Sequence, residues 1–195
     1  MILIFFLLNH SVVNHPIMDS LSYHYSCNQP DTLFMTAECS LIPDEEIKIY
    51  YSKKFGLQVK SDGFSGEIVK GLVMLTGIGI CEFWKSLGTM DTVISEGNFL
   101  TLIPEENNLF SEARLEIDKQ QWLIKAARVR IDSDTVFAKI TYDGRTPLEI
   151  AVKGSSNFTV RHKYKNAGTR NQIPLESTVS FSNDLPDIEV KYKLL

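Results

Sequence analysis

Apolar and polar residues alternate one by one in segment after segment of this 195-residue chain. One apolar set of shared parity runs from Val136 to Tyr142, and another runs from Phe158 to Tyr164. Successive side chains of a β-strand point to opposite faces, so a period of two predicts strands with one apolar and one polar face. Short turn sequences such as Asp143-Gly144 separate these segments, as in β-hairpins. The pattern therefore predicts an all-β protein built from antiparallel strands.

The segments add up to about ten to twelve short strands, and helices are expected to be minor because no long run follows the helical period. Leu21, Tyr23 and Tyr25 share one parity and are expected to form a strand that pairs with residues 33–41. The apolar run from Phe64 to Leu75 is expected to be a strand that is buried on both faces or bent. The Gly-containing stretch 76–88 is expected to be a loop or a single helical turn.

Length and composition limit the organisation and the function class. A chain of this length with 44% hydrophobic residues fits one domain with a sizeable core, which we place at residues 19–195. The net charge is −4, with 20 Lys and Arg against 24 Asp and Glu. This balance lacks the basic excess that binding to a phosphate backbone requires, so nucleic acid is not an expected partner.

Residues 1–18 form a separate N-terminal segment for which three interpretations are open. Its apolar run, Ile2–Leu8, is much shorter than the roughly 20 residues that a membrane-spanning helix needs. No Lys or Arg precedes this run, so a secretory signal here would be a degenerate one. The alternatives are a start assigned too far upstream and an ordinary first strand or helix.

Catalytic and metal-binding patterns are absent from the sequence. Cys27, Cys39 and Cys81 have no metal-ligand spacing, so buried free thiols are expected, with a Cys27–Cys39 disulfide as the alternative. His162 alternates with Val160 and Tyr164, which favours a histidine of the core over a catalytic base. We therefore expect a protein that is not an enzyme and that has no cofactor and no metal site.

The one-sided strands raise the question of what covers their apolar face, because a sheet with one apolar face must bury it. Two architectures remain open. In the first, the strands form a β-sandwich with a fully packed core, as in an interaction or assembly module. In the second, one curved sheet forms an incomplete barrel around an apolar cavity.

Several segments resemble lipoprotein-localisation proteins of the LolA and LolB type and their lipoprotein-sorting relatives. The segments that carry the resemblance are Phe64–Lys70, Glu82–Gly88, Gly97–Pro104, Tyr142–Pro147, Phe158–Val160 and Ile173–Ser177. The resemblance implies a half-barrel that accepts acyl chains or an acylated protein, works in the periplasm or cell envelope, and touches the membrane surface. It further implies that the segment from Ile78 to Leu87 is a mobile, lipid-contacting loop.

Nine apolar residues are the expected wall of this lipid cavity, although each is also compatible with a place in an ordinary core. They are Leu72, Met74, Ile78, Ile80, Phe83, Trp84, Leu100, Leu102 and Trp122. Because each buried methylene contributes about 0.8 kcal/mol, an apolar wall of this kind is enough for useful affinity without a charged contact.

Overall fold

The computed structural model describes residues 16–26, 29–61, 65–78, 90–105, 110–167, 169 and 172–195, and these form two short helices and twelve strands. The elements are α1 (Pro16–Ser26), β1 (Thr32–Cys39), β2 (Ile42–Ser52), β3 (Gly56–Lys60), α2 (Ser65–Leu75), β4 (Met90–Glu96), β5 (Phe99–Pro104), β6 (Glu112–Asp118), β7 (Leu123–Ile131), β8 (Asp134–Asp143), β9 (Thr146–Lys153), β10 (Phe158–Lys165), β11 (Ile173–Phe181) and β12 (Ile188–Leu194).

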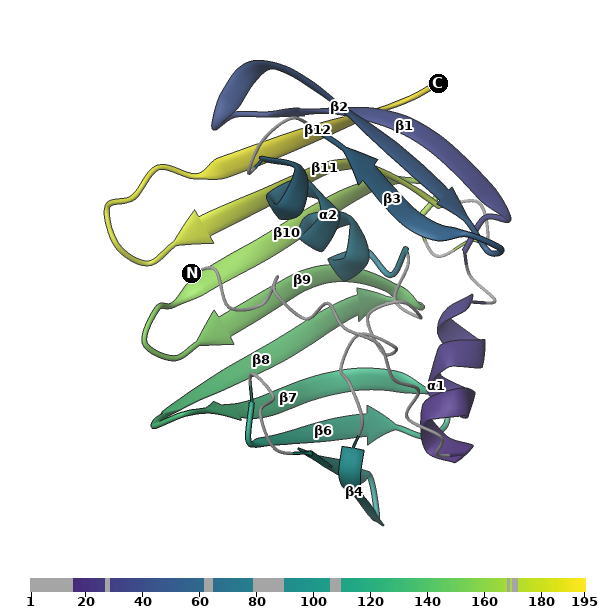
Figure 1. Cartoon of the computed structure of the whole chain (residues 1–195), viewed down its shortest axis with the longest axis vertical. Helices are drawn as coiled ribbons and strands as arrows, with labels where there is room; N and C mark the ends of the chain where they lie inside the picture. The colour runs from purple at the N-terminus through teal and green to yellow at the C-terminus, as the bar shows by residue number, and fades with distance from the viewer. Residues whose placement is uncertain are drawn as a thin grey trace.

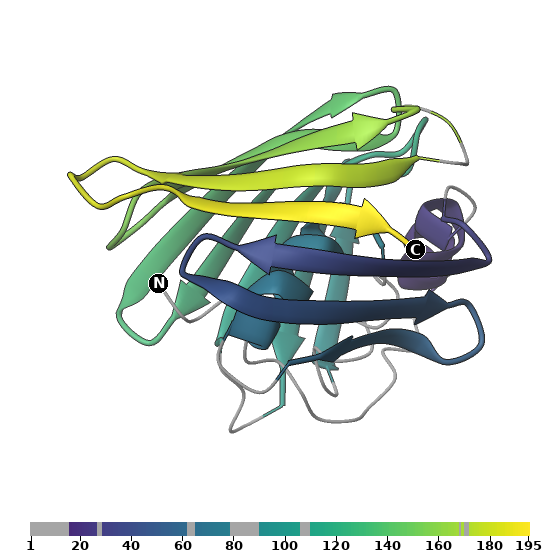
Figure 2. The same ribbon diagram turned by 90° about the horizontal axis from the view of Figure 1, so that it is seen from above.

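All twelve strands belong to one antiparallel sheet in the order β3-β2-β1-β12-β11-β10-β9-β8-β7-β6-β5-β4. Each strand pairs with its neighbour in the chain, except that β3 does not pair with β4. The first strand, β1, pairs with the last, β12, inside the sheet. The sheet curves strongly but does not close, because β3 and β4 remain as free edges (Figures 1 and 2). The prediction of an all-β protein with a single curved sheet is confirmed, and a sandwich of two sheets is wrong.

The hairpin between β8 and β9 illustrates how local sequence sets the register of this sheet. Gly144 has a φ of 56°, the conformation that the Asp143-Gly144 turn signal predicts. The turn brings Ile140 opposite Ile150, which in turn lies opposite Val160 on β10. Apolar side chains of neighbouring strands thus form rows on one face, the concave face of the sheet.

The first helix, α1, replaces a predicted strand. Leu21, Tyr23 and Tyr25 do not pair with β1, whose partners are β2 and β12. The helix begins at Pro16, a residue favoured at the first helical position because its fixed φ suits a helix and it has no N–H to leave unpaired. The buried residues Met18 and Leu21 lie three apart, which is the spacing of one helix face. The helix also runs through residue 18, where the N-terminal segment was expected to end and the domain to begin.

The second helix, α2, replaces the strand expected over residues 64–75. Ile68, Val69, Leu72 and Val73 are buried, and they recur with helical spacing that the continuous apolar run conceals. The helix contacts β1, β2 and β3 on the concave side. Its first residue, Ser65, donates a hydrogen bond to the carboxylate of Glu45 on β2, and Ser61 donates to the same carboxylate. These bonds tie the start of α2 to the sheet.

The buried core is divided between the two ends of the concave face. One cluster joins α2 to β1–β3 and to the inner face of β9–β12, so that α2 is enclosed between opposing strands (Figure 2). The other joins α1 to β5, β6 and the start of β7. Neither α1 nor α2, each 11 residues long, has the length and apolar content that a membrane-crossing helix needs.

Substitution of Gly66 tests how closely α2 packs on the chain that leads into it. A Cβ at this position would lie 2.7 Å from the Cβ of Ser61, which is a clash with an atom close to the backbone. We expect Gly66→Ala to lower the free energy of unfolding by about 1–2 kcal/mol, since overpacking outweighs the helix propensity of alanine. Urea denaturation measures this. In a Ser61→Gly background the same substitution should become neutral or stabilising, and an undiminished loss there would contradict the packing argument.

Candidate functional site: the concave face

The centre of the concave face is the least buried part of the sheet. No residue of β8 is buried, although this strand lies well inside the sheet and four of its apolar side chains, Val136, Ala138, Ile140 and Tyr142, face the two clusters. On β7 burial is complete only at Leu123 and Ile124, where the strand begins. In a fully packed domain, inner strands usually carry the most buried side chains. In this sheet the inner strands β7 and β8 carry fewer buried side chains than the strands on either side, because the two clusters of buried residues lie to either side of them.

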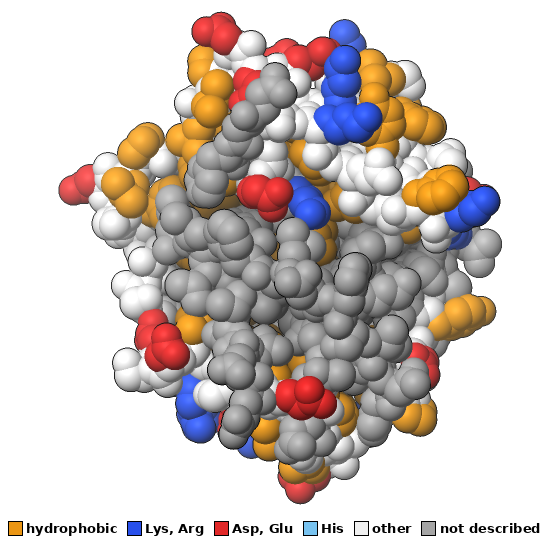
Figure 3. All heavy atoms as spheres, viewed as in Figure 1, with side chains coloured by type: hydrophobic (Ala, Val, Ile, Leu, Met, Phe, Trp, Pro, Cys, Tyr) orange, Lys and Arg blue, Asp and Glu red, His pale blue; other side chains and the backbone are white. Residues whose placement is uncertain are grey.

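We call six of the half-buried apolar side chains of β7 and β8 on this face the central band: Val129, Ile131, Val136, Ala138, Ile140 and Tyr142. Ile140 packs against both core clusters, so the band connects them. The backbone of α2 lies nearest to β1–β3, and its cluster extends to inner side chains of β8–β12. The buried side chains of α1 pack with β5, β6 and β7. Figure 3 shows the molecule from the side on which α2 lies in Figure 1, with hydrophobic side chains visible mostly towards the rim of the view.

Six of the nine predicted wall residues are described, and they fall into two separate groups. Leu72, Met74 and Ile78 belong to the cluster around α2, where Met74 is half-buried and the other two are buried. Leu100, Leu102 and Trp122 belong to the cluster around α1. Leu100 and Leu102 are fully buried, and Trp122 is half-buried with a positive φ of 54°. The predicted wall is therefore divided between the two ends of the concave face.

The other three predicted wall residues, Ile80, Phe83 and Trp84, lie outside the described residues, as does most of the stretch 76–88. The prediction of a lipid-contacting loop there stays a prediction.

The alternation in the sequence predicts that Val136, Ala138, Ile140 and Tyr142 share one strand face, but it does not mark them as a site. No local signal selects them, because the same alternation occurs in strands whose apolar face is fully buried.

A row of hydrogen-bonded polar side chains crosses three strands at the border of the α2 cluster. His162 on β10 lies opposite Ser177 on β11, and its Nδ1 is 2.8 Å from the Ser177 hydroxyl oxygen. That hydroxyl lies 3.0 Å from the hydroxyl of Tyr192 on β12. All three side chains are buried. The second ring nitrogen of His162, Nε2, is buried and has no hydrogen-bond partner among the described residues. The prediction of a core histidine is confirmed, but only one of its nitrogens is satisfied.

Burial controls the protonation of this row. It lowers the pKa of His162 from 6.5 to about 4, so the imidazole is neutral at pH 7. Burial also raises the pKa of the Tyr192 and Tyr164 hydroxyls far above the usual range, and both remain protonated. Tyr164 donates a hydrogen bond of 2.8 Å to the carbonyl oxygen of Pro147. The polar groups on this part of the concave face are therefore uncharged.

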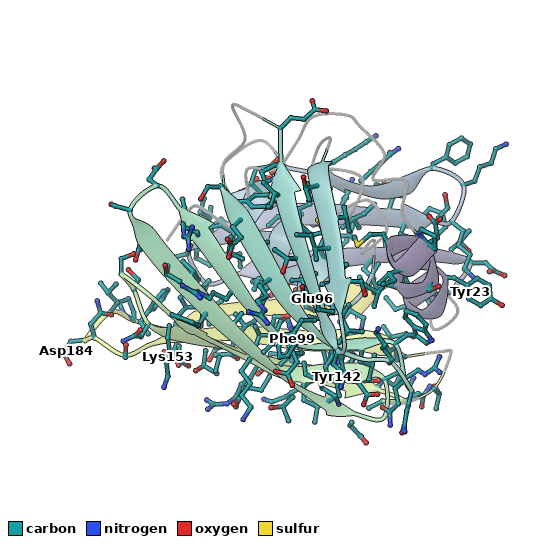
Figure 4. All side chains as sticks on the ribbon, turned by 90° about the horizontal axis from the view of Figure 1, so that it is seen from below. Tyr23, Glu96, Phe99, Tyr142, Lys153 and Asp184 are labelled. Atoms are coloured by element: carbon teal, nitrogen blue, oxygen red, sulfur yellow. The ribbon has the colours of Figure 1, made fainter. Side chains whose placement is uncertain are left out.

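The outer face of the sheet is mostly polar, as the alternation predicts, although Phe99 and Phe137 are exposed apolar side chains. Lys153 projects from this face, and Asp184 lies at the tip of the β11–β12 hairpin (Figure 4). Ion pairs link neighbouring strands, with Arg161 Nε 2.8 Å from a Glu149 carboxylate oxygen. A second pair joins Lys163 to Glu176 over 2.6 Å. Because these groups are exposed, each pair contributes no more than about 1 kcal/mol.

Within the described ranges, no three His, Cys, Asp or Glu side chains lie close enough together to hold a metal ion. Cys39 is a buried free thiol, as expected, while Cys27 and Cys81 lie outside the described residues.

Comparison of the chain with models of known families and with curated proteins gave no match. The interpretation of the concave face therefore rests on its own residues.

The buried His162 makes stability depend on pH in a defined window. Its pKa of about 4 in the folded protein lies below the unfolded value of 6.5, so the unfolded state binds the proton more tightly. The contribution of His162 to the free energy of unfolding is therefore fully present above pH 6.5 and is lost progressively as the pH falls towards 4. We expect about 2 kcal/mol less stability at pH 5 than at pH 7 from this group, measured by urea denaturation. His162→Asn should show a correspondingly smaller loss, and an equal loss in both proteins would contradict the assignment.

Proposed function

We propose that the protein is a non-catalytic binder of lipid acyl chains, which lie along the central band of the concave face. The observation that carries this proposal is the burial of β8. The inward side chains Val136, Ala138 and Ile140 of this inner strand are apolar but only half-buried, while the regions on both sides hold clusters of fully buried side chains. Half-buried apolar surface of this extent is typical of ligand or partner sites.

The chemistry of the band suits an acyl chain. Val129, Val136, Ala138 and Ile140 supply aliphatic surface, and none of them has a polar atom in its side chain. Each methylene that such surface removes from water contributes about 0.8 kcal/mol, so a chain of moderate length can bind tightly through burial alone. Tyr142 at the end of the band donates a hydrogen bond of 2.8 Å to the carbonyl oxygen of Ile124, which fixes its ring as part of the wall.

The resemblance to LolA and LolB extends the proposal to a biological role. In this form of the proposal the acyl chain belongs to a lipid or to an acylated protein, and the protein acts as a carrier or acceptor in the cell envelope. Support comes from the single curved, unclosed sheet, which is the architecture that the resemblance implied. A triacylated peptide and a free acyl probe that compete for one site would support this role.

Binding of a fluorescent acyl probe tests the proposal. We expect the methyl ester of parinaric acid, an uncharged C18 polyene, to bind the full chain with a rise in fluorescence. Ala138→Phe places a large side chain in the middle of the band and should weaken binding at least ten-fold. Thr141→Phe adds the same ring on the outer face of the same strand and should leave binding unchanged.

Two results would contradict the proposal. The first is the absence of probe binding to the unaltered protein, which would favour an interaction module whose partner is another macromolecule. The second is equal binding by the Ala138→Phe and Thr141→Phe variants. Urea denaturation of both variants must show folded protein for the comparison to hold.

A further inference from the structure

Lys125 is the extra residue of a β-bulge near the start of β7. Glu116 on β6 lies opposite Ala126, and Ile117 lies opposite Ile124, so Lys125 has no residue opposite it. A bulge disrupts the regular alternation of a strand and changes the direction of a side chain, and bulges are frequent next to functional sites. The bulge thus places a charged side chain in a strand that carries part of the central band.

The ammonium of Lys125 lies at one end of the central band. Its Nζ is 5.3 Å from the centroid of the Tyr142 ring, and Tyr142 is the last residue of the band on β8. A cation is attracted to the face of an aromatic ring, and the hydrogen bond from Tyr142 to the carbonyl oxygen of Ile124 holds that ring in place. The side chain of Lys125 is 40% exposed, so a ligand on the band can reach it.

This ammonium has unused hydrogen-bond donors. The carboxylate recorded beside it belongs to Asp118, whose Oδ2 is 3.8 Å from Nζ, which is too long for a hydrogen bond. The other oxygen of Asp118 accepts the backbone N–H groups of Gln120 and Gln121 in the turn after β6. No described residue accepts a hydrogen bond from the ammonium, which has three donors to offer a ligand.

The two ends of the band on β8 differ in charge. Asp134 lies two residues before Val136, at the end opposite to Lys125, and its carboxylate accepts two backbone N–H groups. Val136 and Tyr142 are six positions apart on β8, which is roughly 20 Å at about 3.4 Å per residue. This span suits a long extended acyl chain. An acyl ligand with a negative end is therefore favoured in one direction, with its charge at Lys125.

We propose that Lys125 binds the carboxylate of a long-chain fatty acid whose acyl chain lies on the central band. This inference rests on the proposed function and names its ligand. The ammonium donates charge-assisted hydrogen bonds to the carboxylate, while burial of the chain supplies most of the affinity. A singly charged head group is favoured over a phosphate monoester, because one ammonium beside Asp118 cannot balance a charge of about −2.

Parinaric acid and its methyl ester test the inference, because they share one fluorescent C18 chain and differ in charge. At pH 8 we expect Lys125→Met to weaken binding of the acid about five-fold, the upper range for an exposed ion pair, and to leave binding of the ester unchanged. Methionine keeps an unbranched apolar side chain over the Tyr142 ring. The matched control is Lys139→Met, which removes a cation from the outer face of β8 and should change neither affinity.

A second variant, Asp118→Asn, removes the negative charge beside Lys125. Asparagine keeps a side-chain oxygen that can accept the N–H groups of Gln120 and Gln121, so the turn is preserved. We expect this variant to bind the acid about two-fold more tightly and the ester with unchanged affinity, because Asp118 no longer competes for the ammonium or repels the ligand. An unchanged or lower affinity for the acid would contradict the inference.

The outcomes separate the two proposals. If neither the acid nor the ester binds the unaltered protein, lipid binding itself is wrong, and this inference fails with it. If the ester binds, and the Lys125→Met and Lys139→Met variants bind the acid equally well, lipid binding stands and the role of Lys125 is wrong.

Salt dependence gives a measurement on the unaltered protein. Added NaCl screens an exposed pair of charges, so the affinity for the acid should fall as the salt concentration rises, while the affinity for the ester should not fall. The same salt response for both probes would overturn the assignment of Lys125.

Discussion

The structure depends on one constraint, which is that a single large sheet with one apolar face has to remove that face from water. Curvature does part of this, because β1–β3 turn towards β9–β12 and enclose α2 between them. The helix α1 covers β5 and β6 at the other end. Two helices of 11 residues cannot cover twelve strands, and among the described elements the part left half-buried is β7 and β8. The candidate site is a consequence of this limited coverage.

The period of two was sufficient to predict the sheet, because alternation and turn chemistry are local properties. The Asp143-Gly144 hairpin and the one-sided strands β8 to β12 were found at their places. Both helices were missed for a related reason. In α2, the continuous apolar run of residues 64–75 satisfies either period, and the choice is made by tertiary contacts with β1–β3. In α1, the shared parity of Leu21, Tyr23 and Tyr25 fits a strand, whereas Pro16 favours the first turn of a helix.

The candidate site could be predicted only in character, as an apolar inner surface. Leu72 and Leu100 have the apolar side chains expected of a ligand wall, but each lies in a different cluster of buried residues. Which strands the two described helices leave half-buried depends on where these helices pack, and strand alternation carries no information about that. The polar row could not be found either, since His162 and Ser177 are 15 positions apart and meet through the register of β10 and β11.

The division of the core also bears on how this fold can hold a ligand. Among the described residues, the two clusters hold nearly all of the buried apolar side chains, while β7 and β8 contribute hydrogen-bonded backbone but few buried side chains. The inner side chains of β8 therefore account for a small part of the packing that these residues show. In a sheet with one continuous core, a cavity at the centre would cost contacts on every side. The proposed acyl-chain site on the central band is compatible with this division of the core, because the buried side chains of the two clusters lie to either side of it.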